Sequence, residues 1–171
     1  MVDLKNLIRD IPDYPKPGIL FKDITPLLLD PDGFAESVRQ LSAVIGSVGC
    51  EAIVGIESRG FLFGTAVALD LKIGFVPIRK PGKLPYKTVS QSYELEYGTD
   101  SVEIHTDALR AGQRVVIVDD LLATGGTMAA SCKLVESLGA EVAACAFVVE
   151  LAFLEGRQKL KDYRIDSLIS F

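Results

Sequence analysis

The segment from Arg114 to Thr127 constrains the fold more than any other part of the chain. Four β-branched residues, 115–118, lead directly into Asp119 and Asp120, and a Thr-Gly-Gly-Thr sequence follows three residues later. A helical pattern then begins at Met128. A short apolar run between polar residues is typical of a parallel strand buried on both faces. We therefore expect an α/β fold in which this strand brings polar groups to a ligand at its carboxyl end.

The Thr-Gly-Gly-Thr loop has the chemistry of a phosphate site. Its glycines allow the backbone to approach a ligand closely, and the amides at the start of the next helix favour an anion. The lysine of nucleoside-triphosphate loops is missing, and so is the Gly-x-Gly-x-x-Gly pattern of dinucleotide sites. The sequence thus predicts a cup for a phosphate group over residues 123–127, with the sequence Ala123, Thr124, Gly125, Gly126 and Thr127.

Two carboxylates beside a phosphate site need an explanation, because like charges repel one another. A ligand that carries hydroxyl groups next to its phosphate, such as ribose 5-phosphate, would meet this need. Asp119 and Asp120 would then accept hydrogen bonds from the sugar. The sequence also fits a simpler interpretation, in which the strand ends in solvated acids before a glycine turn.

Composition limits the class of protein. A chain of 171 residues is most simply one domain, 1–171, and its net charge of -5 argues against nucleic acid or an anionic membrane as a partner. The longest apolar run, 142–149, cannot span a bilayer, and the charged N-terminus does not resemble a secretory signal. Cys50, Cys132 and Cys145 are scattered without metal-ligand spacing, which predicts reduced thiols in a cytoplasmic protein.

Strand and helix patterns alternate over most of the chain, which predicts a doubly wound sheet. Helices are expected at 30–48, 61–71, 129–138 and 153–161, and further strands at 52–56, 74–78, 141–149 and 165–171. Positively charged residues follow two of these strands. Ser58-Arg59 follows the strand at 52–56, and the strand at 74–78 is followed by Arg79, Lys80 and Lys83. Either they bind an anion at the sheet edge or they form a solvated surface.

Two segments depart from this alternation. Residues 11–26 contain four prolines and are expected to be irregular, with the apolar group around Phe21 either pinned to the core or lining a pocket for a flat ligand. Residues 84–106 alternate between apolar and polar residues, which predicts a β-hairpin outside the parallel sheet. Such a hairpin is suited to act as a lid that excludes water. His105 at its end is interpreted as structural.

The hydrophobic run, acid pair and Thr-Gly-Gly-Thr of residues 115–127 resemble the phosphoribosyl-diphosphate (PRPP) motif of type I phosphoribosyltransferases. The resemblance covers nearly the whole chain, and residues 11–26 resemble the hood of the members that use adenine. It implies a doubly wound, mainly parallel sheet with an N-terminal hood and a β-hairpin lid. It also implies transfer of the 5-phosphoribosyl group of PRPP to N9 of adenine, which gives AMP and pyrophosphate in purine salvage.

The resemblance assigns roles to residues of this chain. The catalytic residues would be Glu96, Asp119 and Asp120, with Glu96 as acid or base at the purine imidazole ring. The phosphate and ribose of PRPP or AMP would bind the two aspartates and residues 123–127. Pyrophosphate would bind Ser58, Arg59, Arg79, Lys80, Lys83 and Tyr97, and adenine would bind Leu20, Phe21, Lys22 and Leu121. Phe21 would stack on the base, while the backbone of its neighbours would read the Watson–Crick edge.

Further expectations follow from the same resemblance. Magnesium would be required and held mainly by the substrate, and the protein would be a homodimer in which Arg79 acts on the neighbouring site. The family often has arginine at the position of Lys22. Alternation alone would instead make Glu96 a solvent-facing hairpin residue.

Two other functions remain compatible with the motif. One is a transferase of the same type that uses a different purine or orotate. The other is a PRPP-sensing transcriptional regulator, which would need a DNA-binding module. This chain has neither spare length nor a basic face for such a module.

Overall fold

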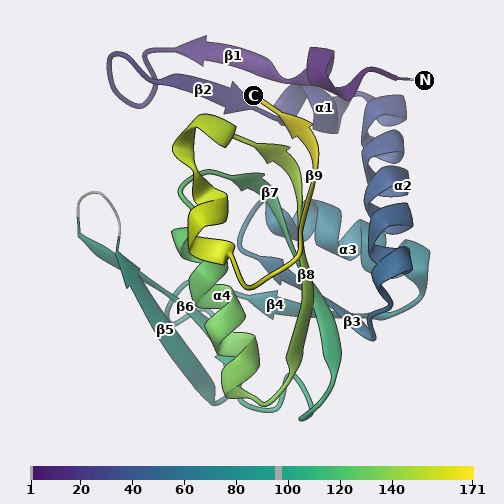
Figure 1. Ribbon diagram of the computed structural model, residues 1–171, viewed down its shortest axis with the longest axis vertical. Helices are drawn as coiled ribbons and strands as arrows, with labels where there is room; N and C mark the ends of the chain where they lie inside the picture. Colours follow the sequence, from purple (N-terminus) through teal and green to yellow (C-terminus); the bar gives the residue numbers. More distant parts are fainter. Residues whose placement is uncertain (1, 95–97) are drawn as a thin grey trace. The chain divides into compact units, whose positions relative to one another are not determined.

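The structure is a computed structural model that describes residues 2–94 and 98–171. Its centre is a five-stranded sheet with the order β4-β3-β7-β8-β9, in which all neighbours are parallel (Figure 1). The strands are β3 (Ala52–Ile56), β4 (Gly74–Ile78), β7 (Arg114–Leu122), β8 (Glu141–Glu150) and β9 (Ile165–Ser170). The predicted parallel α/β sheet is confirmed.

The chain leaves the two central strands in opposite directions. From β3 it passes through α3 (Gly60–Leu71) to the edge strand β4, and from β7 it passes through α4 (Gly126–Ser137) to β8. Because β3 and β7 are neighbours, their carboxyl ends form the point at which the strand order reverses. Doubly wound sheets bind ligands at such a point.

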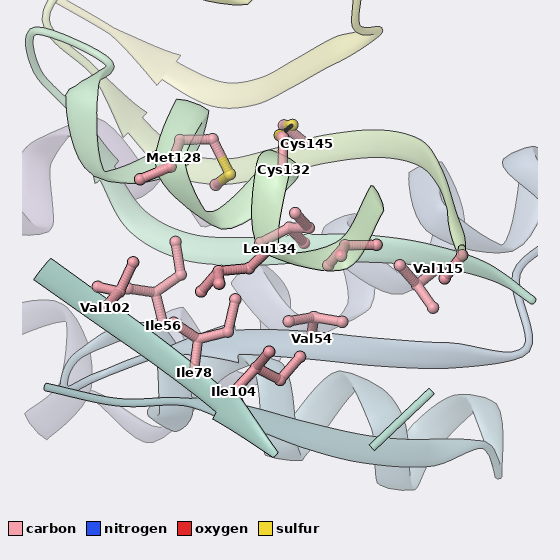
Figure 2. Close-up of a cluster of buried hydrophobic side chains, with 14 of the residues drawn as sticks. Val54, Ile56, Ile78, Val102, Ile104, Val115, Met128, Cys132, Leu134 and Cys145 are labelled. Atoms are coloured by element: carbon pink, nitrogen blue, oxygen red, sulfur yellow. Dashed lines mark hydrogen bonds between the residues drawn. The ribbon is translucent and has the colours of Figure 1, made fainter. Parts of the chain in front are cut away.

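Successive residues of the central strands point to opposite faces of the sheet, and both faces are covered. Val54 and Ile56 of β3 belong to a core cluster with Met128 and Leu134 of α4, as Figure 2 shows. Ile53 points to the other face, where α3 packs closely on the sheet: a Cβ atom on Gly64 would lie only 3.0 Å from the Phe75 side chain of β4. Burial on both faces explains the unbroken apolar runs in these strands.

A β-hairpin lies outside this sheet, as predicted. It consists of β5 (Thr88–Glu94) and β6 (Thr99–His105), which are antiparallel. Two backbone hydrogen bonds join it to the end of β4: Arg79 N–H donates to the Glu103 oxygen (3.0 Å) and Glu103 N–H to the Arg79 oxygen (2.8 Å). The hairpin therefore starts from the same edge of the sheet at which β4 ends.

The chain divides into two compact units, one ending at Gln40 and the other comprising Leu41–Phe171, and the division falls inside helix α2 (Pro31–Val48). The first unit also contains η1 (Leu4–Leu7), β1 (Arg9–Pro12), β2 (Leu20–Asp23) and α1 (Thr25–Leu29). The single domain over 1–171 stays a prediction.

The prediction of irregular structure for residues 11–26 is confirmed for residues 13–19 and wrong for the segments on either side of them. Strands β1 and β2 form an antiparallel pair, with Ile11 opposite Phe21. The prolines do not prevent this pairing because Pro12 ends its short strand and Pro26 lies in the first turn of α1, where its missing N–H is not needed.

Three elements differ from the prediction by more than one residue. Strand β7 continues through both acids to Leu122, and α4 begins at Gly126, three residues before the predicted helix 129–138. Residues 153–161 do not form one helix. They form two 3-10 helices, η2 (Ala152–Leu154) and η3 (Gly156–Leu160), because Glu155 between them is left-handed, with φ of 52°.

Two of the three cysteines meet in the core. Cys132 on α4 and Cys145 on β8 are buried free thiols whose sulfur atoms are 3.6 Å apart. The hydrogen bond between them, together with burial, raises the pKa of the Cys132 thiol, so this group is an unreactive packing residue. Among the residues that the structure describes, no helix has the length and apolar character needed to cross a membrane.

Candidate active site

A cavity of about 370 Å³ lies at the carboxyl ends of β3 and β7. It brings together side chains from the turn after each central strand, from the end of β4 and from the hairpin. Its described lining residues are Ile56, Glu57, Ser58, Arg59, Lys80, Tyr93, Asp119, Asp120, Leu121, Ala123 and Thr127. Most residues predicted for the ribose and pyrophosphate of the ligand thus lie around one space.

The predicted phosphate cup forms a second, smaller cavity of about 80 Å³ beside the first. Residues 121–128 line it together with Asp119 and Phe147. Gly125 caps α4 in the left-handed region, with φ of 79°, and Gly126 is the first helical residue. The first amides of a helix have no partner within it, so this loop presents N–H donors to an anion.

The acid pair is held within the protein rather than in solvent. Asp120 is only 4% exposed, and its Oδ2 atom lies 2.7 Å from the Nε atom of Arg59. Asp119 is half-buried, and its Oδ1 atom accepts a hydrogen bond of 2.9 Å from the Asp120 N–H. A Cβ atom on Gly60, the first residue of α3, would lie 2.9 Å from that same oxygen. The interpretation as solvated strand-end acids is therefore wrong.

Burial controls the ionisation of this pair. Burial, followed by the charge of Asp120, raises the pKa of the Asp119 carboxyl well above its usual value. Burial also raises the pKa of Asp120, although the Arg59 guanidinium acts in the opposite direction. An acid pair with raised pKa values in a cavity is typical of a functional site, because a ligand that donates hydrogen bonds can bind to it.

The raised pKa of Asp119 gives a stability prediction. The folded state holds this proton more tightly than the unfolded state, so its contribution to stability falls as the pH rises toward the folded-state pKa. Asp119→Asn removes a carboxyl whose ionisation the fold disfavours, and we expect a melting temperature a few degrees above that of the parent at pH 7, where about 1 kcal/mol corresponds to roughly 2–4 °C. The difference should shrink as the pH is lowered and the parent carboxyl gains its proton.

Scanning calorimetry from pH 5 to pH 8 would measure this difference. Asp162→Asn is the matched control, because Asp162 is exposed and should not change the melting temperature. A lower melting temperature for Asp119→Asn at pH 7 would contradict the prediction.

Glu57, which the sequence analysis did not select, joins the two turns that carry cations. It follows β3, and its carboxylate accepts hydrogen bonds from Arg79 (3.1 and 3.3 Å) and from the Lys80 backbone N–H (2.8 Å). These bonds, with that of Arg79 first, lower the pKa of Glu57. Its place directly before Ser58-Arg59 was the available signal. The role of Arg79 at a neighbouring subunit stays a prediction.

The hairpin lines the cavity with Tyr93 and holds Lys80 there. The ammonium group of Lys80 forms an ion pair with Asp100 and contacts the Tyr93 hydroxyl at 3.2 Å. Tyr93 and Asp100 lie opposite each other on the two strands of the hairpin. Of the predicted cations, Arg59 and Lys80 line the cavity, whereas Lys83 is exposed and not among its described lining residues. Predicted residues Glu96 and Tyr97 lie outside the described residues.

The residues predicted for adenine belong to different units. Leu121 lines the cavity of the second unit. In the first unit, the Phe21 ring lies edge-on to Tyr14, with centroids 5.2 Å apart. The Lys22 side chain is buried, and its Nζ atom is 2.6 Å from Asp10. Because this side chain stabilises the β1–β2 pair, a ligand contact of Lys22 through its backbone is the one that remains compatible with the fold.

Comparisons with known proteins agree with this arrangement. The phosphoribosyl transferase domain family matches residues 35–171. An adenine phosphoribosyltransferase of Nitrosococcus oceani is 59% identical over the full length of both chains. The crystal structure of an adenine phosphoribosyltransferase from Thermoanaerobacter pseudethanolicus has a TM-score of 0.96 at 59% identity and covers 98% of each chain.

A further crystal structure shows a liganded relative. The adenine phosphoribosyltransferase of Saccharomyces cerevisiae, complexed with an imino-altritol bisphosphate and adenine, has a TM-score of 0.91 at 45% identity and covers 96% of each chain. A cup, an acid pair and two cation-bearing turns thus occur here in a chain that matches such enzymes from end to end. The chain belongs to the adenine phosphoribosyltransferases of the phosphoribosyl transferase family.

Proposed function

We propose that this protein transfers the 5-phosphoribosyl group of PRPP to N9 of adenine and releases AMP and pyrophosphate, as a step of purine salvage. One observation carries this proposal: the phosphate cup and the acid pair follow the same strand and open onto a cavity that also holds cations. The two cavities share Asp119, Leu121, Ala123 and Thr127, so they suit a ligand with a phosphate at one end and hydroxyl groups next to it. The full-length likeness to adenine phosphoribosyltransferases supports the choice of substrate.

Asp119 and Asp120 bind the ribose and act on its charge. Their carboxylates accept hydrogen bonds from the ribose hydroxyls, and their negative charge favours the cationic character that the sugar develops as the bond to pyrophosphate breaks. The amides of residues 123–127 hold the 5′-phosphate. Binding energy from this remote group then positions the anomeric carbon.

The leaving pyrophosphate is received by the turns after β3 and β4. Arg59 and Lys80 line the cavity there, and Ser58 lies beside them. Among the described residues, no group of three or more metal-binding side chains is found. Two carboxylates on one side of the cavity fit a magnesium ion that is held mainly by the oxygen atoms of PRPP. When bound, magnesium supplies positive charge that offsets the negative charge on the leaving group.

Leu121 of the second unit and three residues of the first unit bind the base. Phe21 stacks on adenine, and the backbone of Leu20 and Lys22 binds its Watson–Crick edge. The burial of the Lys22 side chain against Asp10 supports a backbone contact. Four assignments stay predictions: Glu96 as acid or base, Tyr97 at the pyrophosphate, the homodimer and the cytoplasmic location.

One assay tests the proposed function. AMP formation would be measured from PRPP and magnesium with adenine, hypoxanthine, guanine or orotate as the second substrate. Of the four bases, we expect only adenine to give turnover. That turnover should be lost when a chelator removes magnesium. Comparable turnover with another base would contradict the substrate assignment. Tight binding to duplex DNA without nucleotide formation would instead support a regulator.

A further inference from the structure

The phosphate cup has no basic side chain of its own. Residues 123–127 are uncharged, and the acids Asp119 and Asp120 lie next to them. A phosphate monoester carries about −1.5 to −2 charges at neutral pH. The N-terminus of a helix is equivalent to roughly half a positive charge. The helix end therefore leaves most of the charge of a 5′-phosphate unbalanced, and a cation from elsewhere in the chain would offset it.

The 3-10 helix η3 near the C-terminus packs directly on the cup. A Cβ atom on Gly125 would lie only 2.5 Å from the carbonyl oxygen of Gly156, and a Cβ atom on Gly156 would collide with the carbonyl oxygen of Ala123. Both positions thus require glycine, because the two backbones touch. The segment that begins at Gly156 is consequently a wall of the phosphate cup, although it lies about thirty residues further along the chain.

Strong contacts hold this wall in place. The Nε and NH2 atoms of Arg157 each lie 2.6 Å from an oxygen of Glu150, which is buried at the end of β8. Ser167 on β9 donates a third hydrogen bond of 2.6 Å to the same carboxylate. Leu160 at the end of η3 is completely buried. The backbone between Arg157 and Leu160 is therefore held in place relative to the cup.

Lys159 lies within this fixed segment. Its Nζ atom is 3.9 Å from the position that a Cβ atom on Gly126 would occupy, at the first residue of α4. Lys159 and Gly126 line a groove of about 310 Å³ together with Lys133 and the hairpin residues Tyr93 and Glu94. Within residues 2–94 and 98–171, no carboxylate forms an ion pair with Lys159, in contrast to Lys80 and Arg157.

We propose that Lys159 is a further phosphate-binding residue, which provides the cationic charge for the 5′-phosphate held by the cup. The inference rests on the proposed function, since it is that function which places a phosphate monoester in the cup. An ammonium group on a flexible stem can move by the small distance from the edge of the groove to a phosphate oxygen. The charge thus comes from η3, while the amides come from the start of α4.

The test compares Lys159→Gln with the parent. Calorimetry would measure the affinity for ribose 5-phosphate, AMP and adenosine, and steady-state kinetics would give KM for PRPP and kcat. Loss of a charge-assisted hydrogen bond should weaken binding of AMP and ribose 5-phosphate about tenfold to a hundredfold. KM for PRPP should rise by a similar factor with little change in kcat. Binding of adenosine, which has no phosphate, should not change.

Two further variants control for charge and for shape. Lys133→Gln removes the same charge two helical turns further along α4, from the same groove, and should change each affinity less than twofold. Lys159→Arg retains the charge and should restore most of the affinity for AMP. Because Lys159 is exposed, its replacement should leave the melting temperature unchanged.

The proposal is overturned if Lys159→Gln binds ribose 5-phosphate as tightly as the parent does, or if Lys133→Gln weakens binding to the same degree. Failure of the proposed function has a different signature, namely a parent protein that forms no AMP from adenine and PRPP. In that event the ribose 5-phosphate measurements still decide the role of Lys159. A parent that does not bind ribose 5-phosphate would overturn both.

Discussion

Replacement of both acids, by Asp119→Asn with Asp120→Asn, is expected to lower turnover about 10³-fold, the loss seen when one preorganised electrostatic group is removed from an active site. In the proposed reaction the two carboxylates meet the positive charge that the ribosyl group develops, whereas amides of residues 123–127 hold the phosphate. The substitution therefore acts on the reacting carbon far more than on phosphate binding. Unchanged turnover in the double variant would contradict the assignment of the acids to the ribose.

Two measurements separate this effect from damage to the fold. Affinity for ribose 5-phosphate, measured by calorimetry, should fall much less than turnover does. The melting temperature should not fall with Asp119→Asn alone. That substitution removes a carboxyl group whose pKa is raised by burial. A variant that is stable, binds the phosphorylated sugar and yet turns over slowly is the expected outcome.

Gly125→Ala is expected to produce the second large effect. KM for PRPP should rise about tenfold to a hundredfold. Gly125 has a φ of 79°, where an L-residue costs about 1–2 kcal/mol. In addition, its new Cβ atom would lie 2.5 Å from the Gly156 carbonyl oxygen. Since both partners are backbone atoms, the cup itself has to move, and its amides lose their alignment on the phosphate.

Gly112→Ala is the matched control for this prediction. Gly112 has a φ of 75°, but a Cβ atom there would meet nothing within 4 Å. It therefore carries the conformational cost without the collision. We expect both variants to lose stability, as measured by thermal unfolding, and only Gly125→Ala to lose affinity for PRPP and AMP. Equal affinities in the two variants would show that the contact with Gly156 has no role in phosphate binding.

The sequence was sufficient to predict features that depend on local pattern. The buried run at 115–118 indicated a parallel strand because burial on both faces requires apolar residues at every position. The order of strands and helices indicated a doubly wound sheet, which in turn places the residues after β3 and β7 at one edge. This order agrees with the family resemblance, which assigned Arg59 and Asp120 to one site, and the structure brings them to 2.7 Å.

Features that depend on contacts between distant segments could not be predicted in the same way. The approach of Gly156 to the phosphate cup joins two loops whose sequences contain no common pattern. Glu57 was missed because its partners, Arg79 and Lys80, come from the turn after a different strand. The pattern of residues 153–161 suggested a continuous helix, since periodicity does not reveal that Glu155 adopts a left-handed conformation.

The ion pair between Arg59 and Asp120 makes two regions of the cavity thermodynamically dependent on each other. A sugar that engages the Asp120 carboxylate alters the electrostatic surroundings of Arg59, and an anion that engages Arg59 alters those of the carboxylate. Linkage requires that each ligand change the affinity for the other by the same factor. If both bind as proposed, ribose 5-phosphate and pyrophosphate are energetically coupled, and dissociation of either one changes the affinity for the other.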